Sequence, residues 1–87
     1  MPKSQVQTIE VRRMKVLRFI SQQIDFSGKS PSAFWIADHI RTSLPTAYTD
    51  LEWLERQGYI RHTQHETPIV VTENGRAALT KTDGGEK

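Results

Sequence analysis

Several hydroxyl-bearing side chains lie close together in the middle of the chain, between two arginines. The six candidate residues of this segment are Arg41, Ser43, Thr46, Tyr48, Thr49 and Arg56. Hydroxyl groups form hydrogen bonds with phosphates and base edges, a threonine methyl can contact a thymine methyl, and arginine binds phosphate. These residue types predict a surface that recognises nucleic acid. The absence of Lys and Arg from Thr42 to Glu55 favours the alternative, a solvated face with no ligand.

The residue types needed for bond-making chemistry are largely missing. Three histidines, His39, His62 and His65, invite a metal site, but no cysteine or suitably spaced carboxylate completes a set of three or four ligands. The chain also has no glycine-rich phosphate loop and no nucleophile elbow. We therefore expect no metal, no cofactor and no enzymatic activity.

Two short amphipathic helices, within residues 31–60, must position the hydroxyl groups. The apolar residues that share a face are Ala33, Ile36, Ala37 and Ile40 in the first helix, and Ala47, Leu51 and Leu54 in the second. Pro45 suits a first helical turn, and Gly58 suits the left-handed position that ends a helix. The pattern predicts a helix-turn-helix whose second helix, residues 43–57, can enter a DNA major groove.

A longer helix precedes this pair, over residues 5–26. Its apolar stripe consists of Val6, Ile9, Val16, Leu17, Ile20 and Ile24. Arg13 falls inside the stripe, where a charge is unfavourable in a core, so either the helix breaks there or its first half projects beyond the domain. Val11 and Met14 lie on a second face and are candidates for contact with a second subunit. We expect a homodimer.

Aromatic residues on the two short helices support a different function. Trp35 points nearly opposite to the buried face of its helix, and Phe34 lies at the edge of that face. Trp53 flanks the hydroxyl-bearing face of the next helix, with Tyr48 on the other side. Because exposed aromatics are common anchors at protein interfaces, the alternative is a protein-interaction module with weak or no DNA binding. Simple packing under a neighbouring helix or loop would also explain Phe34 and Trp35.

The periodicity changes after Gly58. Two β-rich runs, residues 59–63 and 68–72, flank a short polar tip and predict a hairpin. A hairpin directly after a helix-turn-helix is a wing, and Arg61, His62 and His65 are positioned to touch the sugar-phosphate backbone. Thr72 is expected to cap a last helix over residues 73–80.

The bulk properties indicate one small domain. We expect residues 1–80 to form it, with residues 1–5 frayed and residues 81–87 a disordered tail, in an α+β fold that is mainly α. The net charge is +2; basic residues are in excess over residues 1–30 and acidic residues over residues 31–60. No apolar run has the length of a signal peptide or membrane span, which predicts a cytoplasmic protein.

The helix-turn-helix and wing resemble those of the MarR family of bacterial regulators. That family has a small residue after the first apolar position, a small apolar residue early in the recognition helix, and Leu-x-x-x-Gly before the wing. The corresponding positions here hold Ala37, Ala47 and residues 54–58. Residues 71–79 resemble the family's Leu-Thr-x-x-Gly-Arg-x-x-Leu segment. The resemblance implies a winged helix-turn-helix and a dimeric transcriptional regulator that acts as a repressor on double-stranded DNA.

The front of the helix-turn-helix is also similar to the LexA DNA-binding domain. Residues 28–32, which read Gly-Lys-Ser-Pro-Ser, lead to Ile36 and Ala37 as they do in that family. LexA's protease domain has no counterpart in this sequence. The two resemblances together cover about residues 16–80 and imply binding to DNA through the second helix of the pair and through the wing.

Overall fold

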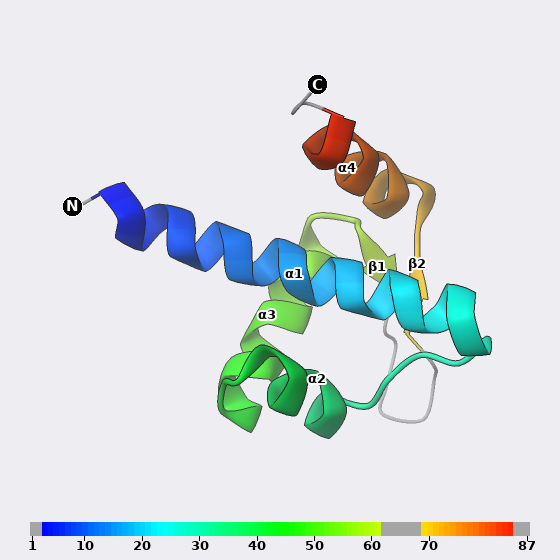
Figure 1. Cartoon of the computed structure of the whole chain (residues 1–87), viewed down its shortest axis with the longest axis horizontal. Helices are drawn as coiled ribbons and strands as arrows, with labels where there is room; N and C mark the ends of the chain where they lie inside the picture. Colours follow the sequence, from blue (N-terminus) through cyan, green and yellow to red (C-terminus); the bar gives the residue numbers. More distant parts are fainter. Residues whose placement is uncertain (1–2, 62–68, 85–87) are drawn as a thin grey trace.

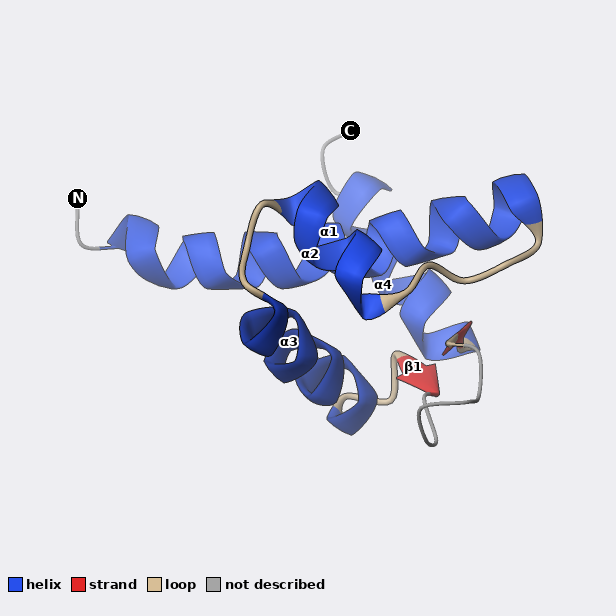
Figure 2. Ribbon diagram, turned by 90° about the horizontal axis from the view of Figure 1, so that it is seen from below, coloured by secondary structure: helices blue, strands red, loops and turns tan. Residues whose placement is uncertain are grey.

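The computed structural model describes residues 3–61 and 69–84 (Figure 1). In chain order, the elements are α1 (Lys3–Ser27), α2 (Ala33–Ile40), α3 (Leu44–Arg56), β1 (Ile60–Arg61), β2 (Val70–Val71) and α4 (Glu73–Gly84). The long α1 crosses the molecule, with α2 and α3 on one side of it and α4 on the other (Figures 1 and 2). The described residues thus confirm a mainly helical winged helix with a two-stranded hairpin.

An apolar core of described residues lies where these helices meet. It is formed by one face of α1 together with the inner faces of α2, α3, the wing strands and α4. Its buried hydrophobic residues are Val16, Leu17, Phe19, Ile20, Ile36, Ala37, Ala47, Leu51, Leu54, Ile60, Ile69 and Leu79. The stripe predicted for α1 is confirmed from Val16 onward, although Phe19 also belongs to the core and was not expected there.

Local signals set the ends of α2 and α3. Ser32 caps α2 by accepting a hydrogen bond from the Trp35 N–H at 3.2 Å, and Ser43 caps α3 in the same way from the Thr46 N–H at 3.2 Å. Arg41 ends α2 in the left-handed conformation, with φ of 66°. Gly58 follows α3 with φ of 79°, as its position in the sequence predicts.

The wing closes onto the end of the helix-turn-helix. β1 and β2 are antiparallel, with Ile60 opposite Val71 and Arg61 opposite Val70. The described strands confirm part of the predicted hairpin, and residues 62–68, including His62 and His65, lie outside the described residues. The base of the wing is also tied to the loop before α2, because the Ile69 N–H donates to Ser30 Oγ at 3.0 Å.

Thr72 joins the wing to α4. Its hydroxyl donates to the Gly58 carbonyl at 2.5 Å and accepts from the Gly75 N–H at 3.0 Å, which confirms the predicted cap. Gly75 is buried against the wing, and a Cβ at this position would lie 2.2 Å from the Tyr59 carbonyl oxygen. The helix continues to Gly84, past Thr80 where the sequence predicts its end, since neither Gly nor Pro occurs between Thr80 and Gly84.

The first half of α1 extends past the rest of the domain as an unbroken helix (Figure 1). The position of Arg13 predicted either a break in this helix or a first half that projects beyond the domain, and the structure shows the projection. None of the described helices combines the length and the apolar character needed to cross a bilayer.

Candidate nucleic-acid interface

The face of α3 that points away from the core is polar and accessible. Ala47, Leu51 and Leu54 are buried against the other helices. On the opposite side Thr49, Glu52 and Arg56 are exposed, while Tyr48 is 39% exposed at its edge. Because the buried residues fix the rotation of the helix, the same hydroxyl, carboxylate and guanidinium groups always face outward.

The hydroxyl groups near the start of α3 already make local hydrogen bonds. Ser43 Oγ donates to Thr46 Oγ1 at 2.9 Å, and Thr49 Oγ1 donates to the Pro45 carbonyl at 3.0 Å. A hydroxyl has one proton and two lone pairs, so Thr49 can still accept a hydrogen bond from an outside group. Thr46 retains its proton and can therefore donate. The local bonds hold both side chains in defined orientations.

The expected phosphate contacts lie at the edges of this face. Arg41 is exposed in the turn before α3, Arg56 is exposed in the last turn of α3, and Arg61 is exposed on β1. The remaining predicted contact, His65, lies outside the described residues. The three arginines therefore lie along α3, from the turn before it to the wing.

A buried ion pair, which our sequence analysis missed, anchors α3. Asp50 is 0% exposed. Its two carboxylate oxygens accept from Arg12, Oδ2 from Nε at 2.8 Å and Oδ1 from Nη2 at 2.9 Å, and Oδ1 also accepts from Arg13 Nε at 3.1 Å. The hydrogen bond to Asp50 is the main reason why the pKa of Arg12 is raised, since burial acts in the opposite direction. We call Arg12, Arg13 and Asp50 the Asp50 cluster.

The Asp50 cluster explains the charge inside the apolar stripe of α1. Arg13 reaches Asp50 across the helix pair, and its guanidinium carbon also lies 4.9 Å from the ring centroid of Trp53. A signal was present in the sequence: Arg13 lies within the apolar stripe of one helix, and Asp50 lies beside Leu51 and Leu54 on another. Two opposite charges on helix faces that are both buried in the core indicate an ion pair between them.

The five residues predicted to contact a partner fall into two groups. Phe34, Trp35 and Val11 are 73%, 54% and 50% exposed, respectively. Met14 and Trp53 are half-buried against the core, and Trp53 also packs edge-on against Tyr59, with ring centroids 6.2 Å apart. Val11 and Met14 line one shallow cleft along α1, so the structure brings these two together.

Among the residues that the structure describes, no group of three or more His, Cys, Asp or Glu side chains could hold a metal ion. His39 is engaged differently: its ring stacks on Phe19, with centroids 4.0 Å apart. No role for His39 in metal binding follows from this arrangement.

Comparison with known protein families identifies a DNA-binding domain. The pattern of the LexA DNA binding domain matches residues 7–67, which include most of α1, the helix-turn-helix and the start of the wing. The family consists of DNA-binding domains rather than enzymes, and the MarR resemblance remains a prediction. A search of individually curated proteins found no significant match. Because the matched residues are well over half of the chain and adopt the expected winged helix, the chain belongs to the LexA DNA-binding domain family.

Proposed function

We propose that this protein is a small transcriptional regulator, acting as a repressor, which binds specific sequences in double-stranded DNA as a homodimer. The observation that carries the proposal is the outward polar face of α3, which is held rigidly by a buried apolar face in a LexA-type DNA-binding domain. In this arrangement α3 lies in the major groove, and the wing lies along the backbone.

In this proposal, Thr46, Tyr48 and Thr49 recognise the DNA bases. Thr49 gives its proton to the Pro45 carbonyl, so toward a base it acts as an acceptor, which suits the amino groups of adenine and cytosine. Thr46 and Tyr48 can each donate, which suits purine N7 and carbonyl oxygens. Glu52, on the same exposed face, is a further acceptor for a cytosine amino group.

Affinity in this proposal comes from the surrounding cations. Arg41, Arg56 and Arg61 contact phosphates, and His65 contacts the backbone beside the wing. With so few cations, and with Glu52 and Glu55 exposed on α3, the dependence of affinity on salt should be modest. Each cation that neutralises one phosphate contributes about 0.9 to the slope of log K against log salt concentration.

The Asp50 cluster supports a link between DNA binding and dimerisation. Arg12 and Arg13 lie on α1 next to Val11 and Met14, and both bind the recognition helix through Asp50. In the proposed dimer, the two copies of α1 pair through Val11 and Met14. The cluster then fixes the angle between the dimer interface and α3.

The test is selection of bound sequences from a pool of random duplex DNA at low and at near-physiological salt. A two-fold symmetric motif with half-sites about one helical turn apart is expected. The double substitution Thr46→Ala and Thr49→Ala should abolish enrichment of that motif while leaving the fold intact by circular dichroism. Retention of DNA only at low salt, with no enriched motif, would refute specific recognition.

A further inference from the structure

The hydroxyl of Ser43 makes two hydrogen bonds to the same residue. Its oxygen accepts from the Thr46 N–H at 3.2 Å, and its proton goes to Thr46 Oγ1 at 2.9 Å. The first bond caps α3, whereas the second joins two side chains and satisfies no backbone group of the helix. Ser43 is exposed and Thr46 is half-buried, so both lie on the accessible start of α3. The second bond therefore has a role other than capping.

The bond between the two hydroxyls determines what Thr46 can offer to a ligand. A hydroxyl carries one proton and two lone pairs. Because the Ser43 proton occupies a lone pair of Thr46 Oγ1, the Thr46 proton does not point back to Ser43 and is available to an acceptor outside the protein. Thr49, about one turn further along α3, has the opposite arrangement, since its own proton goes to the Pro45 carbonyl at 3.0 Å. The two threonines thus present a donor and an acceptor on neighbouring turns.

We propose that Ser43 is a positioning residue for base recognition, which makes Thr46 a hydrogen-bond donor toward DNA. The inference rests on the proposed function, because it concerns the same face of α3. In the major groove, guanine presents only acceptors, whereas cytosine presents only an amino donor. A donor at Thr46 favours guanine over cytosine at the base that it contacts. Ser43 sets this preference without touching the base.

Replacement of Ser43 by aspartate tests the polarity of Thr46 directly. Aspartate is as good an N-cap as serine, so its carboxylate still accepts from the Thr46 N–H and preserves the start of α3. It has no proton at neutral pH, so Thr46 donates to the carboxylate and presents only lone pairs to the DNA. The ratio of affinities for guanine and cytosine should be at least about fivefold in the parent and should be inverted in Ser43→Asp. The added charge weakens binding to all sequences alike and cancels in the ratio.

Two further variants show whether Ser43 acts through Thr46. Thr46→Val removes the hydroxyl at nearly constant volume, and the base position at which it changes preference most is the position to compare. In that background, Ser43→Asp should change the ratio by less than about twofold. Ser43→Thr retains both the proton and the cap and should keep the ratio of the parent within about twofold. An effect of Ser43→Asp that persists without the Thr46 hydroxyl would overturn the inference, because Ser43 would then contact the base itself.

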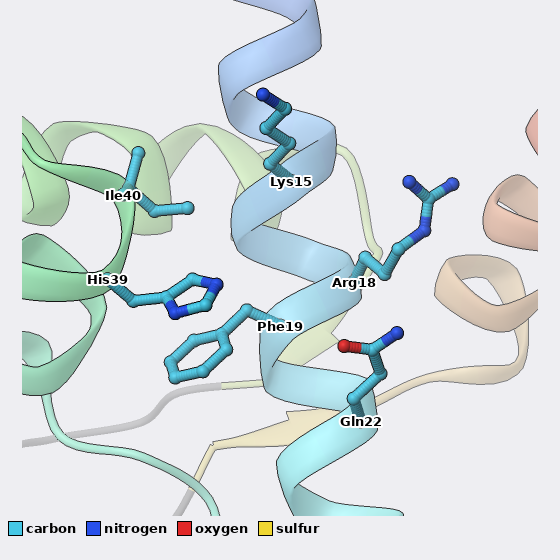
Figure 3. A pocket seen from close by; sticks show the side chains of 6 residues that line it. All are labelled: Lys15, Arg18, Phe19, Gln22, His39 and Ile40. Carbon is cyan, nitrogen blue, oxygen red and sulfur yellow. The ribbon is translucent and has the colours of Figure 1, made fainter.

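Ser32 on α2 provides the matched control. It caps α2 as Ser43 caps α3, by accepting from the Trp35 N–H at 3.2 Å, but Trp35 has no hydroxyl to orient. The ring of His39 helps to hold α2 on α1, because it stacks on Phe19 with centroids 4.0 Å apart (Figure 3). Ser32→Asp therefore keeps the helix pair in place and should leave the ratio within about twofold of the parent. If Ser32→Asp shifts the ratio as much as Ser43→Asp does, added negative charge is sufficient and the inference is wrong.

A measurement without DNA separates this inference from the regulator proposal. Three-bond couplings of the free protein should show one χ1 rotamer for Thr46 in the parent, and averaging between rotamers in Ser43→Gly, which retains most of the cap. Averaging already in the parent would overturn the inference. A parent that enriches no motif would refute the regulator proposal, and this inference with it. An enriched motif with the same ratio for the parent and for Ser43→Asp would refute this inference alone.

Discussion

The guanidinium of Arg12 donates two hydrogen bonds to the carboxylate of Asp50, from Nε to Oδ2 at 2.8 Å and from Nη2 to Oδ1 at 2.9 Å, although Asp50 is fully buried. The two residues are far apart in the sequence, on α1 and on α3. A buried carboxylate is costly unless it is fully hydrogen-bonded, and no buried side-chain polar atom lacks a partner in the described residues. The position of α3 therefore depends on an ion pair. Replacing Arg12 alone would leave the buried carboxylate of Asp50 with fewer hydrogen bonds.

A double-mutant cycle between Arg12→Met and Asp50→Leu should reveal strong coupling. Arg12→Met leaves Asp50 buried with Arg13 only, and we expect a loss of about 2 kcal/mol in the free energy of unfolding. The double variant should be less destabilised than the sum of the two single variants, with a coupling energy of about 1 kcal/mol or more. Urea denaturation of the four proteins measures it.

The pair Arg76–Asp25 is a matched control for that cycle. Arg76 Nη2 on α4 lies 3.0 Å from Asp25 Oδ1 on α1, but the two side chains are 48% and 59% exposed, respectively. Arg76→Gln with Asp25→Asn should give a coupling energy below about 0.5 kcal/mol, as is usual for surface pairs. If the two cycles yield equal coupling, burial of Asp50 does not matter for the fold.

Gly75→Ala should destabilise the domain through the contact between α4 and the wing. The added Cβ would lie 2.2 Å from the Tyr59 carbonyl oxygen and 3.0 Å from Val71 Cγ1, and backbone must move to admit it. We expect a loss of about 2 kcal/mol and a decrease in Tm of roughly 10 °C, measured by thermal unfolding.

Gly28→Ala provides the comparison. Gly28 has φ of 79° but no atom within 4 Å of an added Cβ, so only the left-handed backbone disfavours alanine there. The expected cost is about 1 kcal/mol. An equal or larger effect at Gly28 would contradict the steric explanation for Gly75.

Arg56→Gln should change the dependence of DNA affinity on salt. If Arg56 neutralises one phosphate, the slope of log K against log salt concentration decreases by about 0.9, and affinity falls for all sequences alike. Arg76→Gln removes an exposed arginine of α4 and should leave the slope unchanged. A selective loss of affinity for one base at one position would instead assign Arg56 to base recognition.

Val11→Glu should dissociate the proposed dimer. Val11 is half exposed on α1, next to the half-buried Met14, and a charge there opposes burial against a second copy. Analytical ultracentrifugation should show a dimer for the parent and a monomer for the variant. Gln22→Glu places the same charge on another exposed part of α1 and should preserve the dimer. A parent that is monomeric at high concentration would refute the proposal.

The parts of the fold that depend on local sequence could be predicted. Ser43, Gly58 and Thr72 set the boundaries of α3, the wing and α4 through bonds to residues nearby in the chain or through their own backbone conformation. The polar face of α3 was also predictable, because it follows from the spacing of Ala47, Leu51 and Leu54.

The parts that depend on contacts between distant elements could not be predicted in the same way. Periodicity identifies Asp50 and Arg13 as misplaced charges, but it cannot pair them without the crossing of α1 over α3. It places Trp35 outside the core, but it does not reveal that Phe19 and His39 support the ring. The close approach of Gly75 to Tyr59 is likewise a property of packing, and nothing in the neighbouring residues indicates it.

Arg41 shows how the demands of folding and of binding can diverge at one residue. Its backbone is left-handed, a conformation that glycine adopts freely and that costs other residues roughly 1 kcal/mol. Replacing Arg41 with glycine would therefore make the turn more stable and, if Arg41 contacts phosphate as proposed, the protein a weaker ligand for DNA. A search for more heat-resistant variants would select this change early and, if Arg41 contacts phosphate, would thereby enrich proteins that bind DNA more weakly.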